Sequence, residues 1–320
     1  MCYAIPARII EIHEHIAIVD YFGEQRRILL DDTTLAIGDY VYAQGGICVR
    51  KIPEEEAEEI LETWKNIFFE LKKVDETLSH VDAENLPENI LDVLQKVNYR
   101  QALSHEEVEA LMALRDPNEL KVLYEVSNHV RQRIHGNASC VHGIIEFSNY
   151  CCNSCHYCGI RREHDIPRYR MPPEDIIAAA RYAVETYDFK ALVLQSGEDY
   201  GYDNITLAHV VREVRRLGVL VFVSIGLRDE ETYQALYDAG ARAALIRFES
   251  SNEELFAKMR PATTLSRRLE LIHNVKKMGY IIATGFIVGL PGETPQDTVN
   301  NIFLTKSLQP DMYSFGPLIP

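Results

Sequence analysis

Short apolar runs separated by turn residues occupy residues 1–52. The runs AIPARIIEI, IAIVDYF, RRILL and YVYAQGGICV are rich in residues that favour β-strands. Phe22-Gly23 and Ile37-Gly38-Asp39 supply turn signals between them. Several short strands joined by tight turns are typical of a small β-barrel, so we expect one here.

Helical spacing follows this region. Pro53 and the acidic residues after it predict a helix start, and the apolar positions then recur every three or four residues. We assign residues 1–75 to this first module, residues 76–88 to a polar linker and residues 89–136 to a helical lead-in.

Apolar and amphipathic segments alternate from residue 137 to residue 320. The apolar runs are GIIEFS, ALVLQSG, VLVFVSIG, AALIRFES, IIATGFIVGL and MYSFGPLI. Such runs, with helices between them, predict a parallel α/β sheet, either a barrel or doubly wound. The chain stops just after the sixth run, so the segment from Gly143 to Pro320 is shorter than the ~250 residues of a closed eight-unit barrel. We therefore expect an incomplete (β/α) TIM-type barrel and a fragment of a longer protein.

Composition and charge narrow the class of protein. Apolar residues make up 47% and charged residues 25%, while the net charge is −15 and the sequence pI is about 5.2. This balance argues against a nucleic-acid partner. No apolar run is long enough to cross a bilayer, and no signal peptide is visible, so we expect a cytoplasmic protein without a membrane partner.

Four of the seven cysteines lie within NYCCNSCHYCGI, residues 149–160. A ferredoxin run through Cys152 fails, because the fourth cysteine would have to stand at position 162, which is Arg162. A structural zinc site needs four ligands, and these cysteines are packed too closely for the usual two separated pairs.

The remaining spacing, C-x3-C-x2-C, uses Cys151, Cys155 and Cys158, with Tyr157 directly before the last cysteine. Three thiolates on a 4Fe-4S cluster leave one iron open for chemistry. The loop follows the first strand of the predicted barrel, at the face where such barrels carry active sites. Cys152 is left as an ordinary thiol, and zinc remains the alternative.

This loop resembles that of the radical S-adenosylmethionine (SAM) superfamily. Together with RYRMPPEDI, VLQSGED, IRFES, MRPATTLSRRL, VGLPGET and FGPLIP, it is similar to the HydE-type FeFe-hydrogenase maturases of the biotin-synthase-like branch, over residues 88–320. The resemblance implies a 4Fe-4S cluster and SAM as cofactors. It also implies that one electron splits SAM into methionine and a 5′-deoxyadenosyl radical.

The resemblance also assigns residues to SAM. It implies that the amino group of SAM is received by Ser196, Gly197 and Glu198. Glu249 would then hold a hydroxyl or ammonium group of SAM, and Arg268 would hold its carboxylate. The adenine pocket would be lined by Ile287 and the turn Gly289–Gly292. Arg247 is expected to bind an anionic substrate or SAM, and Ser224 is a weaker SAM candidate. Two positions depart from the family, because Leu227 and Phe248 replace polar residues, which leaves the substrate open.

The first module resembles the HypC/HupF hydrogenase maturation chaperones through MCYAIPARIIEI, GDYVYAQGGICVRKI and PEEEAEEILETW. In that family Cys2, after removal of Met1, binds an iron fragment, so Cys2 is expected to be an iron ligand. Gln44 stands where the family has a histidine. Cys48, in an apolar strand, is predicted to be a packed core thiol.

Two classes of function follow. The first is a radical SAM enzyme that acts on an iron–cysteine organometallic precursor, with hydrogenase maturation proteins and a flavodoxin- or ferredoxin-type electron donor as partners. A methylornithine synthase-like amino-acid mutase is an alternative within this class. The second class is a carrier or scaffold for an iron fragment that has no catalytic turnover.

Overall fold

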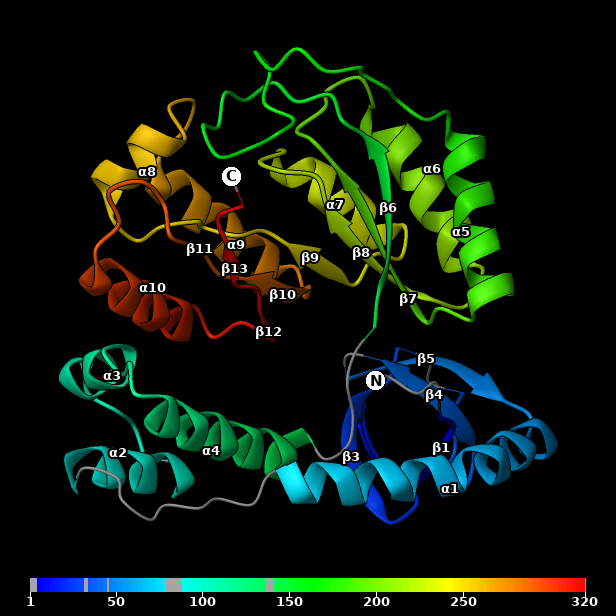
Figure 1. The fold of residues 1–320 in the computed structure, drawn as a ribbon. Coiled ribbons are helices and arrows are strands. Elements are labelled where there is room, and N and C mark those ends of the chain that lie inside the picture. The colour runs from blue at the N-terminus through cyan, green and yellow to red at the C-terminus, as the bar shows by residue number, and fades with distance from the viewer. Residues whose placement is uncertain are drawn as a thin grey trace. The chain divides into compact units, whose positions relative to one another are not determined.

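The computed structural model describes residues 5–31, 34–44, 46–78, 88–99, 101–135 and 141–319. The chain divides into two compact units, Met1–Val141 and His142–Pro320. The first unit contains β1 (Ala7–His13), β2 (Ile16–Tyr21), β3 (Glu24–Leu29), β4 (Tyr40–Gln44), β5 (Ile47–Ile52), α1 (Glu54–Leu78), α2 (Glu88–Asn98), α3 (His105–Met112) and α4 (Pro117–His135) (Figure 1).

The strands of the first unit close into a barrel in the order β1-β2-β3-β5-β4, as the sequence predicts. Alternate side chains of β1 and β2 point inward, so Ile9 and Val19 are buried in the barrel core. Cys48 is also buried there, which confirms its prediction as a core thiol. Helix α1 begins after Pro53, and its buried Phe68 packs on the ring of Phe22 at 5.0 Å between centroids.

Helices α2, α3 and α4 pack around a separate small apolar core. Ile90 and Leu94 of α2 and Val122 and Val126 of α4 are buried in it, together with Leu114. Ser104 begins α3 with a capping box, because its hydroxyl accepts from Glu107 while the Glu107 carboxylate accepts from the Ser104 backbone. The expected linker began at residue 76, but α1 continues to residue 78 and residues 79–87 lie outside the described residues.

The second unit alternates strand and helix along its length. It contains β6 (Gly143–Ser148), α5 (Pro173–Tyr187), β7 (Ala191–Ser196), α6 (Asn204–Arg215), β8 (Leu220–Ser224), α7 (Glu230–Asp238), β9 (Ala243–Leu245), α8 (Glu253–Met259), α9 (Leu265–Lys277), β10 (Ile281–Thr284), β11 (Ile287–Val288), α10 (Pro295–Leu308), β12 (Met312–Tyr313) and β13 (Gly316–Pro317). Six strands pair in parallel in the order β12-β10-β9-β8-β7-β6. This arrangement confirms the incomplete (β/α) barrel.

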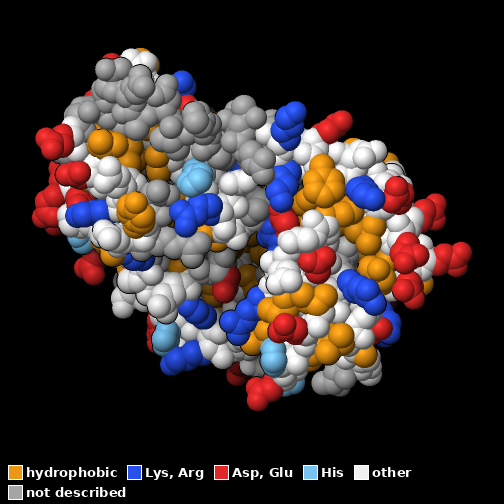
Figure 2. Space-filling model, turned by 90° about the horizontal axis from the view of Figure 1, so that it is seen from below, with side chains coloured by type: hydrophobic (Ala, Val, Ile, Leu, Met, Phe, Trp, Pro, Cys, Tyr) orange, Lys and Arg blue, Asp and Glu red, His pale blue; other side chains and the backbone are white. Residues whose placement is uncertain are grey.

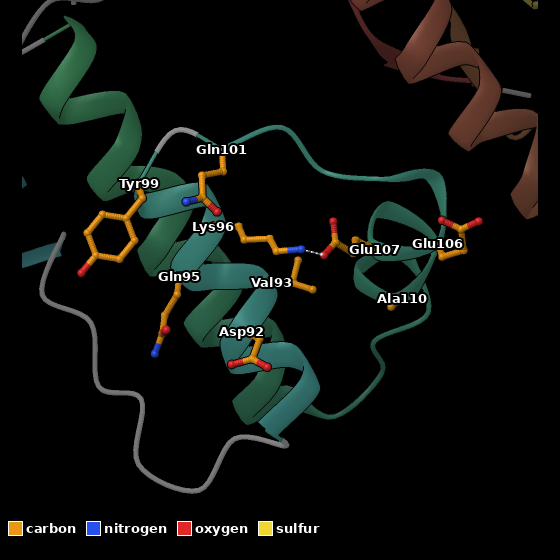
Figure 3. A pocket seen from close by; sticks show the side chains of 9 residues that line it. All are labelled: Asp92, Val93, Gln95, Lys96, Tyr99, Gln101, Glu106, Glu107 and Ala110. Atoms are coloured by element: carbon orange, nitrogen blue, oxygen red, sulfur yellow. Dashed lines mark hydrogen bonds and ion pairs between the residues drawn. The ribbon is translucent and has the colours of Figure 1, made fainter.

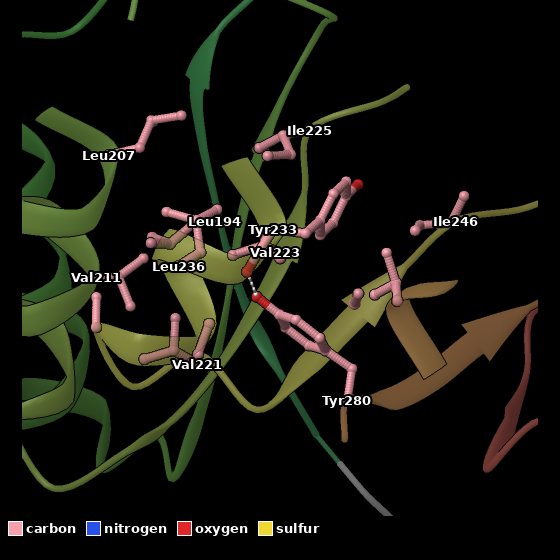
Figure 4. Close-up of a cluster of buried hydrophobic side chains, with 14 of the residues drawn as sticks. Leu194, Leu207, Val211, Val221, Val223, Ile225, Tyr233, Leu236, Ile246 and Tyr280 are labelled. Carbon is pink, nitrogen blue, oxygen red and sulfur yellow. Dashed lines mark hydrogen bonds between the residues drawn. The ribbon is translucent and has the colours of Figure 1, made fainter. Parts of the chain in front are cut away.

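The main core of the second unit lies between the sheet and the helices that cover it. Figure 4 shows Leu194 of β7 and Val223 of β8 meeting Val211 of α6 and Leu236 of α7. Burial of aliphatic side chains of this size contributes about 1.5–3 kcal/mol each. Among the aromatics, the Tyr280 hydroxyl donates to the backbone oxygen of Tyr233 at 2.8 Å, which satisfies a polar group inside this core.

Two local features differ from the sequence pattern. The apolar run Ile281–Leu290 predicts one strand, but it forms β10 and β11, with a break at Gly285. A Cβ at Gly285 would lie 2.2 Å from the backbone oxygen of Ser314, so the chain passes too close there for any side chain. Helix α8 is not predicted either, since its seven residues are too few to show a clear helical period.

Acidic and basic side chains are interspersed over the face shown in Figure 2, with apolar side chains between them. None of the helices that the structure describes combines the length and the apolar character that a membrane crossing requires.

Candidate functional site

The clustered cysteines lie in the loop that follows β6 at its C-terminal end. Cys155 is buried, Cys151 and Cys158 are half-buried, and Cys152 is exposed. The predicted C-x3-C-x2-C set therefore consists of the three more sheltered cysteines, and Cys152, which it omits, is the most exposed of the four. That these three bind a cluster stays a prediction.

Arg168 fixes the shape of this loop. Its guanidinium donates to four backbone oxygens, those of Asn149 at 2.6 Å, Ile160 at 2.9 Å, Arg161 at 2.6 Å and His164 at 2.9 Å. Each of these carbonyls comes from a different point of the loop, so one side chain closes it around the cysteines. A planar guanidinium is suited to this task because its donors form a rigid fork.

The cysteine loop also lies directly against the end of β7. A Cβ at Gly197 would be 2.2 Å from the Tyr150 oxygen and 2.8 Å from the Cys151 Cβ. The Glu198 backbone N–H points at the Cys151 sulfur, 3.4 Å away, and the Cys152 N–H donates to the Glu198 oxygen at 3.1 Å. The glycine in this strand end is therefore required by the approach of the cysteine loop.

Glu198 joins the cysteine loop to the loop after β8. Its buried carboxylate accepts from the Leu227 backbone N–H at 2.7 Å, and its other oxygen lies 3.7 Å from the Cys152 sulfur. Burial, and then the Glu198 charge, raises the pKa of Cys152 to about 11. Leu227, where the sequence departs from the family pattern, thus contributes its backbone N–H to this contact and not its side chain.

A second carboxylate, Asp199, was not singled out by the sequence analysis. It is buried and accepts from the Ser148 hydroxyl at 2.6 Å and from two nitrogens of Arg170 at 2.7 Å each. Arg228 donates to the Asp199 backbone oxygen at 2.8 Å. These bonds hold together the ends of β6, β7 and β8. The two partners stand in RYR (Arg170) and in SGED (Asp199), and these segments are too far apart in sequence for a local pattern to pair them.

Charged side chains from three further segments meet near Tyr157 of the cysteine loop. The Arg260 Nη1 donates to the Tyr157 hydroxyl at 3.0 Å, and the Arg268 Nε donates to the Arg247 backbone oxygen at 2.7 Å. Arg247 Nε lies 3.3 Å from Glu249 Oε2. Glu249 has a φ of 71°, a conformation that costs a non-glycine residue of order 1–3 kcal/mol and is often found at functional sites.

These groups carry an excess of buried positive charge. Arg260 and Arg268 are 7% and 5% exposed, against one carboxylate, Glu249, at 6%. Three buried atoms of these side chains have no hydrogen-bond partner among the described residues, namely Glu249 Oε2, Arg260 Nε and Arg268 Nη1. The contact of Arg247 Nε with Glu249 Oε2 is an ion pair without hydrogen-bond alignment. Each such atom costs about 1–3 kcal/mol. A ligand that brings negative charge together with an ammonium or hydroxyl group would satisfy all three.

An apolar wall adjoins these charges. Leu255 and Met259 of α8, Ile287 of β11 and Leu290 form one buried cluster, and Tyr157 packs against it. The structure thus brings the predicted adenine-pocket residue Ile287 beside the aromatic residue of the cysteine loop. A flat apolar ring could lie against this surface.

The two serines predicted for SAM lie at neighbouring strand ends. Ser196 ends β7 and Ser224 ends β8, and both are half-buried. The Ser196 hydroxyl donates to the Gly197 oxygen at 2.7 Å. Both serines therefore lie at the same edge of the sheet as the cysteine loop.

The ligand requirements of zinc and of an iron–sulfur cluster differ. Within the described ranges, no three His, Cys, Asp or Glu side chains converge closely enough to share a single metal ion. A structural zinc ion needs four ligands around one centre, whereas thiolates of a cubane cluster bind different irons and stand farther apart. Three thiols in one loop are the donor type that iron–sulfur clusters take, so the residues present fit such a cluster. Cys2 and Cys140 lie outside the described residues, while Gln44 is buried on β4.

An open pocket of about 580 Å³ lies between α2 and α3 of the first unit. The Lys96–Glu107 ion pair crosses it (Figure 3), and its remaining lining is largely polar. None of the residues predicted for the cluster or for SAM lines this pocket, and α3 contributes no buried residue. We therefore place the candidate site at the cysteine loop.

Comparison with known families finds two matches. The model of the radical SAM superfamily matches residues 145–304, half of the chain, and that of the HupF/HypC family matches residues 1–64. The two matched segments do not overlap. They correspond to the second unit and to the barrel and early α1 of the first.

The chain is also similar to individual proteins. The [FeFe] hydrogenase maturase subunit HydE of Thermotoga maritima is 36% identical over 230 residues, 72% of this chain and 66% of that protein. The 3-methylornithine synthase of Methanosarcina acetivorans is 29% identical over 244 residues, 75% of this chain and 67% of that protein. The crystal structure of methylornithine synthase (PylB) matches with a TM-score of 0.68 and 26% identity, covering 71% of this chain and 68% of that one. This chain thus spans about two thirds of the length of the curated relatives it matches.

Proposed function

The chain belongs to the radical SAM superfamily, and from this premise we propose that it cleaves SAM reductively during assembly of a hydrogenase metal cofactor. The observation that carries the proposal is the cysteine loop beside buried charges. Tyr157, between Cys155 and Cys158, accepts from Arg260, and the nearby buried Glu249, Arg260 and Arg268 side chains have unpartnered atoms. That combination suits an anionic cluster and a zwitterionic ligand together.

In this proposal Cys151, Cys155 and Cys158 hold a 4Fe-4S cluster. When bound, the cluster supplies the electron that splits SAM into methionine and a 5′-deoxyadenosyl radical. The chain's own contribution is to hold the thiolates in one loop and to shelter them. Arg168 closes that loop, and the N–H of Glu198 points at the Cys151 sulfur.

The surrounding side chains are proposed to orient SAM. Arg268 would bind the carboxylate, Glu249 would accept from the ammonium or a hydroxyl group, and the wall around Ile287 would take the adenine ring. Ser196, Gly197, Glu198 and Ser224 form the strand-end rim. Because the Glu198 carboxylate already accepts from the Leu227 N–H, its role toward SAM would use the oxygen nearer Cys152.

The proposed substrate is an organometallic iron–cysteine precursor. Arg247 is about one third exposed and lies beside Glu249, so its guanidinium is available to an anionic group at the mouth of the site. The HupF/HypC match supports a first module that receives or presents an iron fragment. We propose other hydrogenase maturation proteins and a flavodoxin- or ferredoxin-type electron donor as partners.

The test is the formation of methionine and 5′-deoxyadenosine after anaerobic iron–sulfur reconstitution, with dithionite as reductant. Wild type, Cys151→Ser and Cys152→Ser form the set, since the two variants remove adjacent thiols. Wild type and Cys152→Ser should cleave SAM, and Cys151→Ser should not. An inactive Cys152→Ser would overturn the ligand assignment. A wild type that binds the cluster without cleaving SAM would indicate the carrier function instead.

An amino-acid mutase is the second candidate, favoured by the likeness to methylornithine synthase in sequence and structure. The two candidates differ in the substrate that accelerates SAM cleavage. A radical SAM enzyme with its proper substrate turns over SAM faster than without it, because the radical has a target. Acceleration by an iron–cysteine complex would support the maturase, and acceleration by free amino acids would support the mutase.

A further inference from the structure

Two hydrogen bonds connect the middle of the cysteine loop to the end of α8. The His156 N–H donates to the Met259 oxygen at 2.9 Å, and the Arg260 guanidinium donates to the Tyr157 hydroxyl at 3.0 Å. Residues 156 and 157 are those between Cys155 and Cys158. Arg260 therefore contacts, through the Tyr157 side chain, the segment between two of the predicted cluster ligands.

The environment of Arg260 is unusual for a guanidinium. The residue is 7% exposed, its Nε has no hydrogen-bond partner among the described residues, and the partner of its Nη1 is a neutral hydroxyl. A buried charge without an opposite charge is strongly unfavourable. Glu249 is the nearby carboxylate, but Arg247 and Arg268 already face it. A purely structural tie between the loop and α8 would not require this charge.

The thiolates of Cys155 and Cys158 offer the missing negative charge. The hydrogen bonds from Arg260 to Tyr157 and from His156 to Met259 hold the guanidinium against the segment between these two cysteines. The positive charge of Arg260 thus lies near the segment that connects Cys155 with Cys158. Positive charge near a cluster favours the reduced form, which carries one more electron.

We propose that Arg260 is a positioning residue that holds Tyr157 in place and raises the reduction potential of the cluster through its charge. This inference rests on the proposed function, because it requires a 4Fe-4S cluster on Cys151, Cys155 and Cys158. In this role Arg260 acts through Tyr157 and through its charge, and not on a reacting atom. The property it changes is the reduction potential of the cluster before any SAM is bound.

The test is a redox titration of the reconstituted full-length protein without SAM, followed by electron paramagnetic resonance, with iron content measured on each sample. Arg260→Gln removes the charge, Arg260→Lys keeps it, and Arg267→Gln removes a charge from an exposed helix position that is paired with Glu270. Arg260→Gln should shift the reduction equilibrium about tenfold toward the oxidised form, equivalent to about 59 mV for one electron. Arg260→Lys should retain most of the potential, and Arg267→Gln should match wild type.

Each other result has a defined meaning. An Arg260→Gln protein with a full cluster and the wild-type potential would overturn the inference and leave Arg260 as a structural tie. Loss of the cluster from Arg260→Gln but not from Arg260→Lys would overturn the assignment to the reduction potential, since the charge would then act in cluster retention. Loss of the cluster from both variants would also overturn the inference, because cluster retention would then depend on the planar shape of the guanidinium and not on its charge. If wild type itself holds no 4Fe-4S cluster, the proposed function fails, independently of Arg260.

Discussion

Gly197 lies where the cysteine loop crosses the end of β7, and its lack of a side chain permits that crossing. We predict that Gly197→Ala pushes the loop away, because its Cβ would meet the Tyr150 oxygen at 2.2 Å and the Cys151 Cβ at 2.8 Å. Overpacking of this kind costs about 1–3 kcal/mol. The reconstituted variant should hold less iron than wild type and should unfold at a lower temperature.

Gly159, in the same loop, provides the matched control. A Cβ there would have nothing within 4 Å. Gly159→Ala should therefore keep both iron content and thermal stability. Equal iron content in Gly197→Ala and wild type would contradict the prediction, since the loop would then tolerate the displacement without moving Cys151.

Hydrogen bonds of Asp199 connect the ends of three strands, β6, β7 and β8. Burial raises its pKa, but the hydrogen bonds from Arg170 and Ser148 outweigh this and hold the pKa below its ordinary value of 3.8. A lowered pKa in the folded state means that the stabilisation is present above about pH 4 and is lost as the pH falls through the lowered value. We predict that Asp199→Asn lowers the free energy of unfolding by about 1–3 kcal/mol at neutral pH.

The pH profile distinguishes this charge effect from simple loss of packing. The stability difference between wild type and Asp199→Asn should stay constant from pH 5 to pH 8 and shrink below about pH 4 in denaturant titrations. Asp175→Asn, on an exposed turn of α5, should differ little from wild type throughout. A difference for Asp199→Asn that persists unchanged at low pH would show that the charge is not responsible.

The cysteine loop as an element depends on Arg168. We predict that Arg168→Met opens it, because four backbone oxygens lose their donor at once. Hydrogen exchange followed by mass spectrometry should show faster exchange in peptides covering residues 149–168. Arg162→Met is the control from the same loop, since Arg162 is exposed and pairs with its neighbour Glu163. Similar exchange in both variants would contradict the assignment of loop closure to Arg168.

Elements with a clear period were predictable, and the contacts between distant elements were not. The pattern predicted α5, α9 and the parallel strands, because each presents a repeating apolar face to one core. The cysteine set followed from local spacing and from its place after a strand. The Arg260–Tyr157 and Asp199–Arg170 contacts join residues far apart in sequence, so no local pattern signals them.

The whole chain has two compact units with separate apolar cores, and the predicted cluster ligands all lie in the second. A ligand that binds only the folded state stabilises the unit that contains its site, by about 4 kcal/mol when its concentration is a thousand times Kd. We therefore predict that calorimetry of the reconstituted protein resolves two transitions. Removing the iron with a chelator should lower one of them and leave the other in place.

Hydrogen exchange identifies which transition belongs to which unit. After iron removal, protection should fall in peptides from β6 to α8 and stay unchanged in the barrel strands β1 to β5. Cys151→Ser, which lacks a predicted ligand, should resemble the chelated wild type before any chelator is added. If both transitions shifted together, the units would unfold cooperatively, and cluster binding would stabilise the chain as a whole rather than the radical SAM unit alone.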